Sequence, residues 1–147
     1  MTNSIIMEIE TVEIEFSTRG KTDIIDITPK VNQVLEKTEF KEGHIILFSV
    51  GSTSGLSTIE YEPGLVHHDV SRMFDNFAPY GDHYQHNLTW GDDNGASHLR
   101  STLTGSSLTI PFKNNKLMMG TWQQIAYFDF DTRPRSRKVI IQLIGKK

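Results

Sequence analysis

The residues with the most chemical potential lie between positions 84 and 105, in the stretch YQHNLTWGDDNGASHLRSTLTG. Two imidazoles, His86 and His98, stand on either side of an acid–amide pair, Asp93 and Asn94. Imidazole exchanges protons near neutral pH, binds metals when neutral and binds phosphate when protonated. Because the stretch is rich in turn-forming residues and lacks apolar periodicity, we expect a binding or catalytic loop and not a core segment.

Each of these residues also has a simpler interpretation. His86 and His98 are twelve positions apart, a spacing that allows convergence but matches no standard zinc signature, so both rings could merely hydrogen-bond loop backbone. The Asp93-Asn94-Gly95 sequence is typical of a plain turn. It also precedes an expected helix start, where free N–H groups bind anions and an aspartate orients an imidazole or caps the helix.

Three hydroxyl residues, Ser52, Thr53 and Ser54, stand between Gly51 and Gly55. Such a segment can hold a phosphate through backbone N–H groups. Because no lysine follows, it is not a P-loop, and a hydroxyl-rich bend between strands is the alternative. We expect the three residues to contribute to a phosphate site.

Further ligand contacts are expected from Gln123, Arg135 and Arg137. A glutamine amide both donates and accepts hydrogen bonds, which suits recognition of a ring edge. Arginine suits bidentate contact with phosphate. A solvated basic hairpin is the alternative for the two arginines.

A metal site is a weaker hypothesis. His86 and His98 would supply two ligands, and Glu62 is a candidate for the third. A divalent ion, Mg²⁺ or Zn²⁺, is the expected cofactor if one is used. Exposed surface acids are the usual explanation for any single carboxylate of this kind.

Composition narrows the class of protein. The chain has 147 residues, 37% of them hydrophobic, so we expect one globular domain over 1–147. The absence of cysteine excludes disulfides and a thiolate nucleophile. A net charge of −3 gives no reason to expect a nucleic-acid partner. No apolar run is long enough for a membrane span, and we see no signal peptide, so we expect a soluble cytoplasmic protein.

The hydrophobic pattern predicts an α+β fold with mostly antiparallel sheets packed as a sandwich with two or three helices. Alternation over 5–18 predicts a half-buried strand, and the apolar run 44–50 predicts a strand buried on both faces. We expect a loop over 80–94. The remaining predicted strands are 23–27, 56–61, 108–112, 117–130 and 138–144, and the predicted helices begin at Thr28 and Pro63 and span 96–104, the last ending at a left-handed Gly105.

Several strings resemble one family over roughly residues 10–145. LTGSSLTIPF, LMMGTWQQI and DTRPRSRKVIIQLIG are similar to the YjbQ family. Its YxH, DN and AHL elements correspond to Tyr84–His86, Asp93–Asn94 and His98–Leu99. Ser52 stands where the family usually carries the histidine of its HTTA element. A site of three histidines would therefore lack one ligand.

The resemblance implies a homotrimer with ligand sites near subunit boundaries. It also implies a secondary thiamine-phosphate synthase activity on a phosphorylated small molecule, with Mg²⁺ as the usual companion of the pyrophosphate. His86 and His98 would then handle protons, with Asp93 and Asn94 beside them. A non-catalytic metal- or anion-binding module is the alternative, and a purely structural partner protein ranks last.

Overall fold

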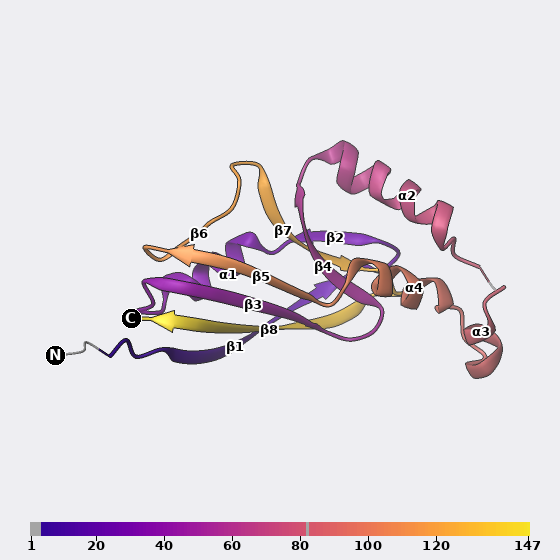
Figure 1. Ribbon diagram of the computed structural model, residues 1–147. Coiled ribbons are helices and arrows are strands. Elements are labelled where there is room, and N and C mark those ends of the chain that lie inside the picture. The colour runs from indigo at the N-terminus through magenta and orange to yellow at the C-terminus, as the bar shows by residue number, and fades with distance from the viewer. Residues whose placement is uncertain (1–3, 82) are drawn as a thin grey trace.

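The computed structural model describes residues 4–81 and 83–147, which form two antiparallel sheets with helices beside them (Figure 1). The larger sheet has the order β1 (Glu8–Thr18), β8 (Arg135–Lys146), β3 (Glu42–Val50), β5 (Ser107–Lys113) and β6 (Lys116–Leu117). The smaller sheet has the order β2 (Asp23–Asp26), β7 (Gln123–Asp129) and β4 (Ser54–Glu60). The helical segments are α1 (Thr28–Glu36), the π-helical η1 (Leu65–Asp69), α2 (Val70–Phe77), α3 (Gln85–Trp90) and α4 (Gly95–Thr104).

The predicted α+β class with antiparallel sheets is confirmed, but the number of helices was underestimated. Four α-helices are present in the described residues, and α3 occupies part of the segment expected to be a loop. Gly91 ends α3 in the left-handed conformation at φ +66, and its N–H donates to the Asn87 carbonyl at 2.8 Å. A single turn closed by glycine lacks the apolar periodicity from which helices are predicted.

The two sheets and α1 share one apolar core. Ile45 and Leu47 of β3, Ile125 and Tyr127 of β7 and Val31 of α1 are all fully buried in the same cluster. The start of helix α1 follows from its sequence, because Pro29 fits the first helical turn and leaves Val31 on the inner face. The core therefore fixes the strand ends from which the polar loops extend.

The interpretation of β3 as buried on both faces was wrong. Its inner residues Ile45 and Leu47 are fully buried, whereas Phe48 is 45% exposed and Val50 is 42% exposed. The strand therefore alternates like β1, whose half-buried Val12 and exposed Glu13 follow the predicted period of two. Among the residues that the structure describes, no element packs over these outer side chains.

The predicted long strand 117–130 is also corrected. Strand β6 ends at Leu117 and β7 begins at Gln123, and the segment between them is not a strand. Trp122 therefore lies outside the core and is 74% exposed. The hairpin turn before it is formed by Asn114 and Asn115, which have φ of 53 and 57, the left-handed values that such two-residue turns need.

Two smaller corrections concern helix ends. The single helix expected from Pro63 is divided into η1 and α2. Gly105 has a positive φ of 91 as expected at a helix end, but its ψ of 158 lies outside the left-handed helical region. Across the described residues, no helix is both long and apolar enough to cross a membrane.

Candidate functional site

The two histidines meet where α3 and α4 join. His86 lies on α3 and His98 on α4, and their ring centroids are 4.4 Å apart with the planes inclined by 58°. Both side chains are half-buried. The structure thus brings together the two imidazoles that the sequence singled out, at the end of the molecule opposite the two termini (Figure 1).

His86 has two acceptors at one ring nitrogen. Its Nε2 donates to Asn94 Oδ1 at 3.1 Å and lies 3.4 Å from Asp92 Oδ2. Two acceptors at Nε2 place the proton there, so Nδ1 is the basic nitrogen of the neutral ring. Asn94 was predicted as a site residue, whereas Asp92 was not.

A buried asparagine holds the α3–α4 corner in place. Asn87 Oδ1 accepts a hydrogen bond from the Gly95 N–H at 2.8 Å, and its Nδ2 donates to the Gly81 carbonyl at 2.8 Å. Gly95 has no room for a side chain, because an added Cβ would lie 2.6 Å from Tyr84 Cβ. This packing fixes the start of α4, and with it Asn94 and His98.

Asp93 faces the connection between β7 and β8. Thr132 Oγ1 donates to Asp93 Oδ1 at 2.8 Å. This bond spans a cavity of about 220 Å³ whose lining residues come from both connections: Asp92, Asp93, Asn94, Asp131, Thr132, Arg133 and Arg135. We call it the Asp–Arg cavity. Three predicted site residues, Asp93, Asn94 and Arg135, therefore line one cavity beside His86.

The arginines of the cavity differ in their contacts. Arg135 Nε donates to Asp131 Oδ2 at 2.7 Å. Burial opposes ionisation of Asp131, but hydrogen bonds from Arg135 and the Thr132 N–H outweigh it and lower the pKa of the Asp131 carboxyl. Arg133 is exposed and makes no ion pair or side-chain hydrogen bond with any described residue. Arg133 is thus available for an incoming anion.

A tight turn positions the backbone of this connection. Gly20, Lys21 and Thr22 all have positive φ, at 80, 53 and 65. The Lys21 N–H donates to the Asp131 carbonyl at 2.6 Å, and a Cβ on Gly20 would lie 2.6 Å from the Arg133 carbonyl oxygen. Only glycine permits so close an approach, so this turn sets the position of Arg133.

Arg137, predicted as a phosphate contact, lies inside the fold. It is 9% exposed, and its Nε and Nη2 donate to the two oxygens of the fully buried Asp129 at 2.7 Å each. Nη2 also donates to Thr53 Oγ1 at 2.7 Å. Burial opposes the charge, but Asp129 outweighs it and raises the pKa of Arg137. Arg137 and Thr53 are thus engaged in a buried ion-pair network instead of facing a ligand.

The other predicted phosphate contacts do not gather at the cavity. Ser54 is fully buried, with its Oγ 2.7 Å from Ser49 Oγ, while Ser52 is exposed. Gln123 accepts from the Gly120 N–H at 3.0 Å and donates to Thr58 Oγ1 at 2.8 Å. Gln123 is the first residue of β7, and these bonds hold the start of that strand in place.

Glu62 is engaged elsewhere as well. Its carboxylate accepts from the N–H groups of Gly64, at 3.0 Å, and Leu65, so it stabilises the start of η1. Within residues 4–81 and 83–147, no group of three His, Asp or Glu side chains is arranged to hold a metal ion. The expected combination of Glu62 with His86 and His98 is therefore not assembled in this chain.

Several cavity residues were missed by sequence reasoning. Asp92, Asp131, Thr132 and Arg133 all line the cavity, yet none was selected as a site residue. Asp131 to Arg133 belong to the DTRPRSRK string, which is part of the family resemblance. The string alone does not indicate which of its arginines is exposed. Imidazole is able to transfer protons and an unpaired arginine is able to bind an anion, so the assembled groups have the chemical means for both.

The fold and this cavity define a class of small α+β proteins with a histidine pair next to an arginine-lined cavity. The family described as UPF0047 protein YjbQ-like matches residues 12–146. A UPF0047 protein of Methanothermobacter thermautotrophicus is 36% identical over 97% of this chain and 96% of its own length. One from Archaeoglobus fulgidus is 34% identical over 90% and 100%.

Solved structures agree with the sequence matches. A YbjQ-like protein of unknown function from Sulfolobus solfataricus has a TM-score of 0.89 and 30% identity, covering 96% of this chain and 100% of that one. A hypothetical protein from Aeropyrum pernix has a TM-score of 0.86 and 28% identity, covering 93% and 99%. This chain belongs to the UPF0047, YjbQ-like family.

Proposed function

We propose that this protein is an enzyme acting on a phosphorylated small molecule in the Asp–Arg cavity, with a weak thiamine-phosphate synthase type of activity. The observation that carries the proposal is the His86–His98 pair, 4.4 Å between centroids, next to a cavity that contains the unpaired Arg133. The reaction requires an anion site for the departing pyrophosphate, and a proton donated to that leaving group assists its departure.

The reaction assigns a task to each group. The ring nitrogen of a thiazole phosphate attacks the methylene carbon of a pyrimidine pyrophosphate, the C–O bond breaks and pyrophosphate leaves. Arg133 and the free Nη atoms of Arg135 would contact the leaving group, which carries Mg²⁺ as part of the substrate. The substitution itself moves no proton, so the histidine pair would act on the leaving group: a protonated ring of His86 or His98 would donate its proton to a pyrophosphate oxygen as the C–O bond breaks.

The experiment compares thiamine phosphate formation by the purified protein and by His86→Ala and His98→Ala. Loss of general acid–base catalysis costs roughly 10²- to 10⁴-fold, so we expect a loss of that order in both variants. His44→Ala is the matched control, because His44 is exposed on β3. Equal rates in all four proteins, with equal melting temperatures, would reject the assignment of the site.

A non-catalytic metal- or anion-binding module is the second candidate. It is favoured by the proximity of Asp92 to His86, at 3.4 Å, with His98 against the same ring. The two histidines would then supply two ligands to a Zn²⁺, with Asp92 orienting the His86 ring, and the coordination would be completed from outside the chain. Metal bound at a fixed ratio, lost in His98→Ala and accompanied by no turnover would select this module over the enzyme.

We also propose that the protein works in the cytoplasm as a homotrimer. Support comes from large apolar side chains at the surface of α2, α3 and α4, where Phe77 is 71%, Leu88 73% and Leu103 63% exposed. Exposed apolar groups of this size mark association surfaces. Light scattering on the purified protein measures the assembly.

A further inference from the structure

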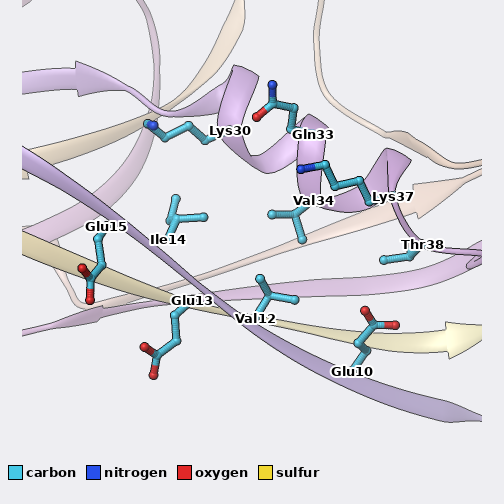
Figure 2. A pocket seen from close by; sticks show the side chains of 10 residues that line it. All are labelled: Glu10, Val12, Glu13, Ile14, Glu15, Lys30, Gln33, Val34, Lys37 and Thr38. Carbon is cyan, nitrogen blue, oxygen red and sulfur yellow. The ribbon is translucent and has the colours of Figure 1, made fainter.

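A groove runs between the edge strand β1 and helix α1, far along the chain from the histidine pair. Its cavity volume is about 390 Å³. Figure 2 shows Val12 and Ile14 of β1 and Val34 of α1 between the strand and the helix, with Lys30 and Lys37 above them on α1. The groove therefore has an apolar floor, a basic wall on α1 and acidic residues, Glu10, Glu13 and Glu15, along β1.

The larger sheet is incompletely covered at this groove. On β8, Val139 and Ile141 are fully buried, whereas their neighbours Ile14 and Val12 on β1 are only half-buried. The second layer of the fold thus ends short of β1. An added apolar group would complete the burial of Val12 and Ile14.

Strand β1 also presents unpaired backbone. Within the described residues it pairs only with β8, over all positions from Glu8 to Thr18. Alternate N–H and carbonyl groups along its other edge are therefore free to hydrogen-bond to another strand. The residues of β1 that line the groove run from Glu10 to Glu15, enough for an extended segment of about six residues.

The charges along β1 select the partner. Figure 2 shows Glu13 and Glu15 on the side of the strand away from α1, and both carboxylates share one ammonium, that of Lys138, at 2.8 and 3.5 Å. A second copy pairing through its own β1 would bring glutamates opposite glutamates, which is destabilising. A strand with basic residues on its outer face would be attracted instead.

The inner face imposes a different requirement. There the added strand would meet Val12, Ile14 and Val34, so its inward residues should be apolar. Lys30 and Lys37 have no acidic partner within ion-pair distance among the described residues, so an inward acid at one end would be stabilised. The complementary sequence therefore alternates basic residues with apolar ones and includes one inward acid.

We propose that the β1–α1 groove binds an extended peptide segment of another protein, which adds to the edge of β1 as a sixth strand. The segment carries basic side chains opposite Glu13 and Glu15 and apolar side chains over Val12 and Ile14. Main-chain hydrogen bonds supply affinity and the alternating side chains supply specificity. This recognition is independent of the Asp–Arg cavity, since the two share no lining residue.

The test uses the whole protein and a fluorescent hexapeptide, acetyl-Lys-Val-Lys-Ile-Lys-Glu-amide, with binding followed by anisotropy. A peptide of the same composition in the order Lys-Lys-Lys-Val-Ile-Glu loses the alternation, and an N-methylated copy of the first loses its backbone donors. We expect saturable binding of the first peptide only. Equal binding of the scrambled peptide would overturn the proposal and leave general charge attraction, and no binding of the first would overturn it outright.

A variant locates the binding on β1. The double variant Glu13→Gln and Glu15→Gln should weaken binding by about tenfold, because two favourable cross-strand pairs are lost. The double variant Glu60→Gln and Asp69→Asn removes the same charge from exposed positions outside the groove and should bind like the parent. Equal affinities of the two double variants, with both melting as the parent does, would reject β1 as the docking edge.

Discussion

Arg133 and Arg137 lie four residues apart in the sequence, but one is exposed and the other is buried. Arg137 is buried, and Asp129 and Thr53 satisfy its guanidinium. Arg133 is exposed at the mouth of the Asp–Arg cavity and pairs with no described side chain. The difference arises because Arg137 is inside β8, on its inward face, whereas Arg133 is in the connection before the strand.

An arginine inside the strand is therefore structural, whereas an arginine in the connection before the strand is available to bind a ligand. A buried ion pair adds little net stability over an apolar pair, but removal of one partner is costly because the other charge is left uncompensated. An exposed arginine contributes little to folding and is free to bind. Stability measurements should therefore separate the two residues sharply.

The largest effect is expected from Arg137→Ala. It leaves Asp129 fully buried without its partner, so the free energy of unfolding should fall by about 3–5 kcal/mol. Arg133→Ala should change it by about 0.5 kcal/mol or less, since surface substitutions usually do. Urea unfolding of the two variants measures both values, and similar losses in both would contradict the distinction.

A smaller effect is expected on anion binding, and here Arg133 is the important residue instead of Arg137. Arg133→Ala removes charge-assisted hydrogen bonds worth about 1.5–3 kcal/mol, so the affinity for inorganic pyrophosphate should fall roughly ten- to hundredfold. Lys116→Ala, at an exposed position on β6, is the control and should bind normally. Calorimetry with pyrophosphate measures the affinities. If both variants bind like the parent, Arg133 does not contact the anion.

The smallest effect concerns Asp131 and the pH dependence of the free energy of unfolding. Its folded pKa is lowered, so its ionised form stabilises the protein above the ordinary value of about 4, and this contribution is lost as the pH falls through the folded pKa. The difference in unfolding free energy between the parent and Asp131→Asn should therefore shrink below about pH 4. Urea unfolding over a pH series measures it, with Glu60→Gln as the exposed control. A difference that is constant with pH would contradict the assignment.

Much of the fold followed from periodicity. Alternation identified β1, and the Thr28-Pro29 pair identified the start of α1, because both signals are local. The errors arose where tertiary structure decides. Phe48 and Val50 of β3 look like core residues in sequence, but within residues 4–81 and 83–147 no layer covers their face of the strand.

The candidate site was partly predictable for the same reason. His86, His98, Asp93 and Asn94 stand within one short segment, so their proximity could be anticipated. Arg137 could not be separated from Arg135 by residue type, because its role depends on pairing with Asp129 across the β7–β8 connection. Asp92 was missed because neighbouring Asp93 fits the same pattern, and only the helix geometry decides which carboxylate reaches His86.

The sheet order has a consequence for how the chain folds. Strand β1 pairs with β8 and β2 pairs with β7, so the first strands of the chain hydrogen-bond to the last ones. The smaller sheet is incomplete until β7, residues 123–129, has left the ribosome, and the larger sheet until β8, residues 135–146, has done so. Pairing over such sequence distances is slow, because a long loop must close before any contact compensates for it. During synthesis, β1 and β2 are therefore unpaired until their partner strands are made. The acidic residues along β1 disfavour pairing of the unpaired strand with another copy of the chain.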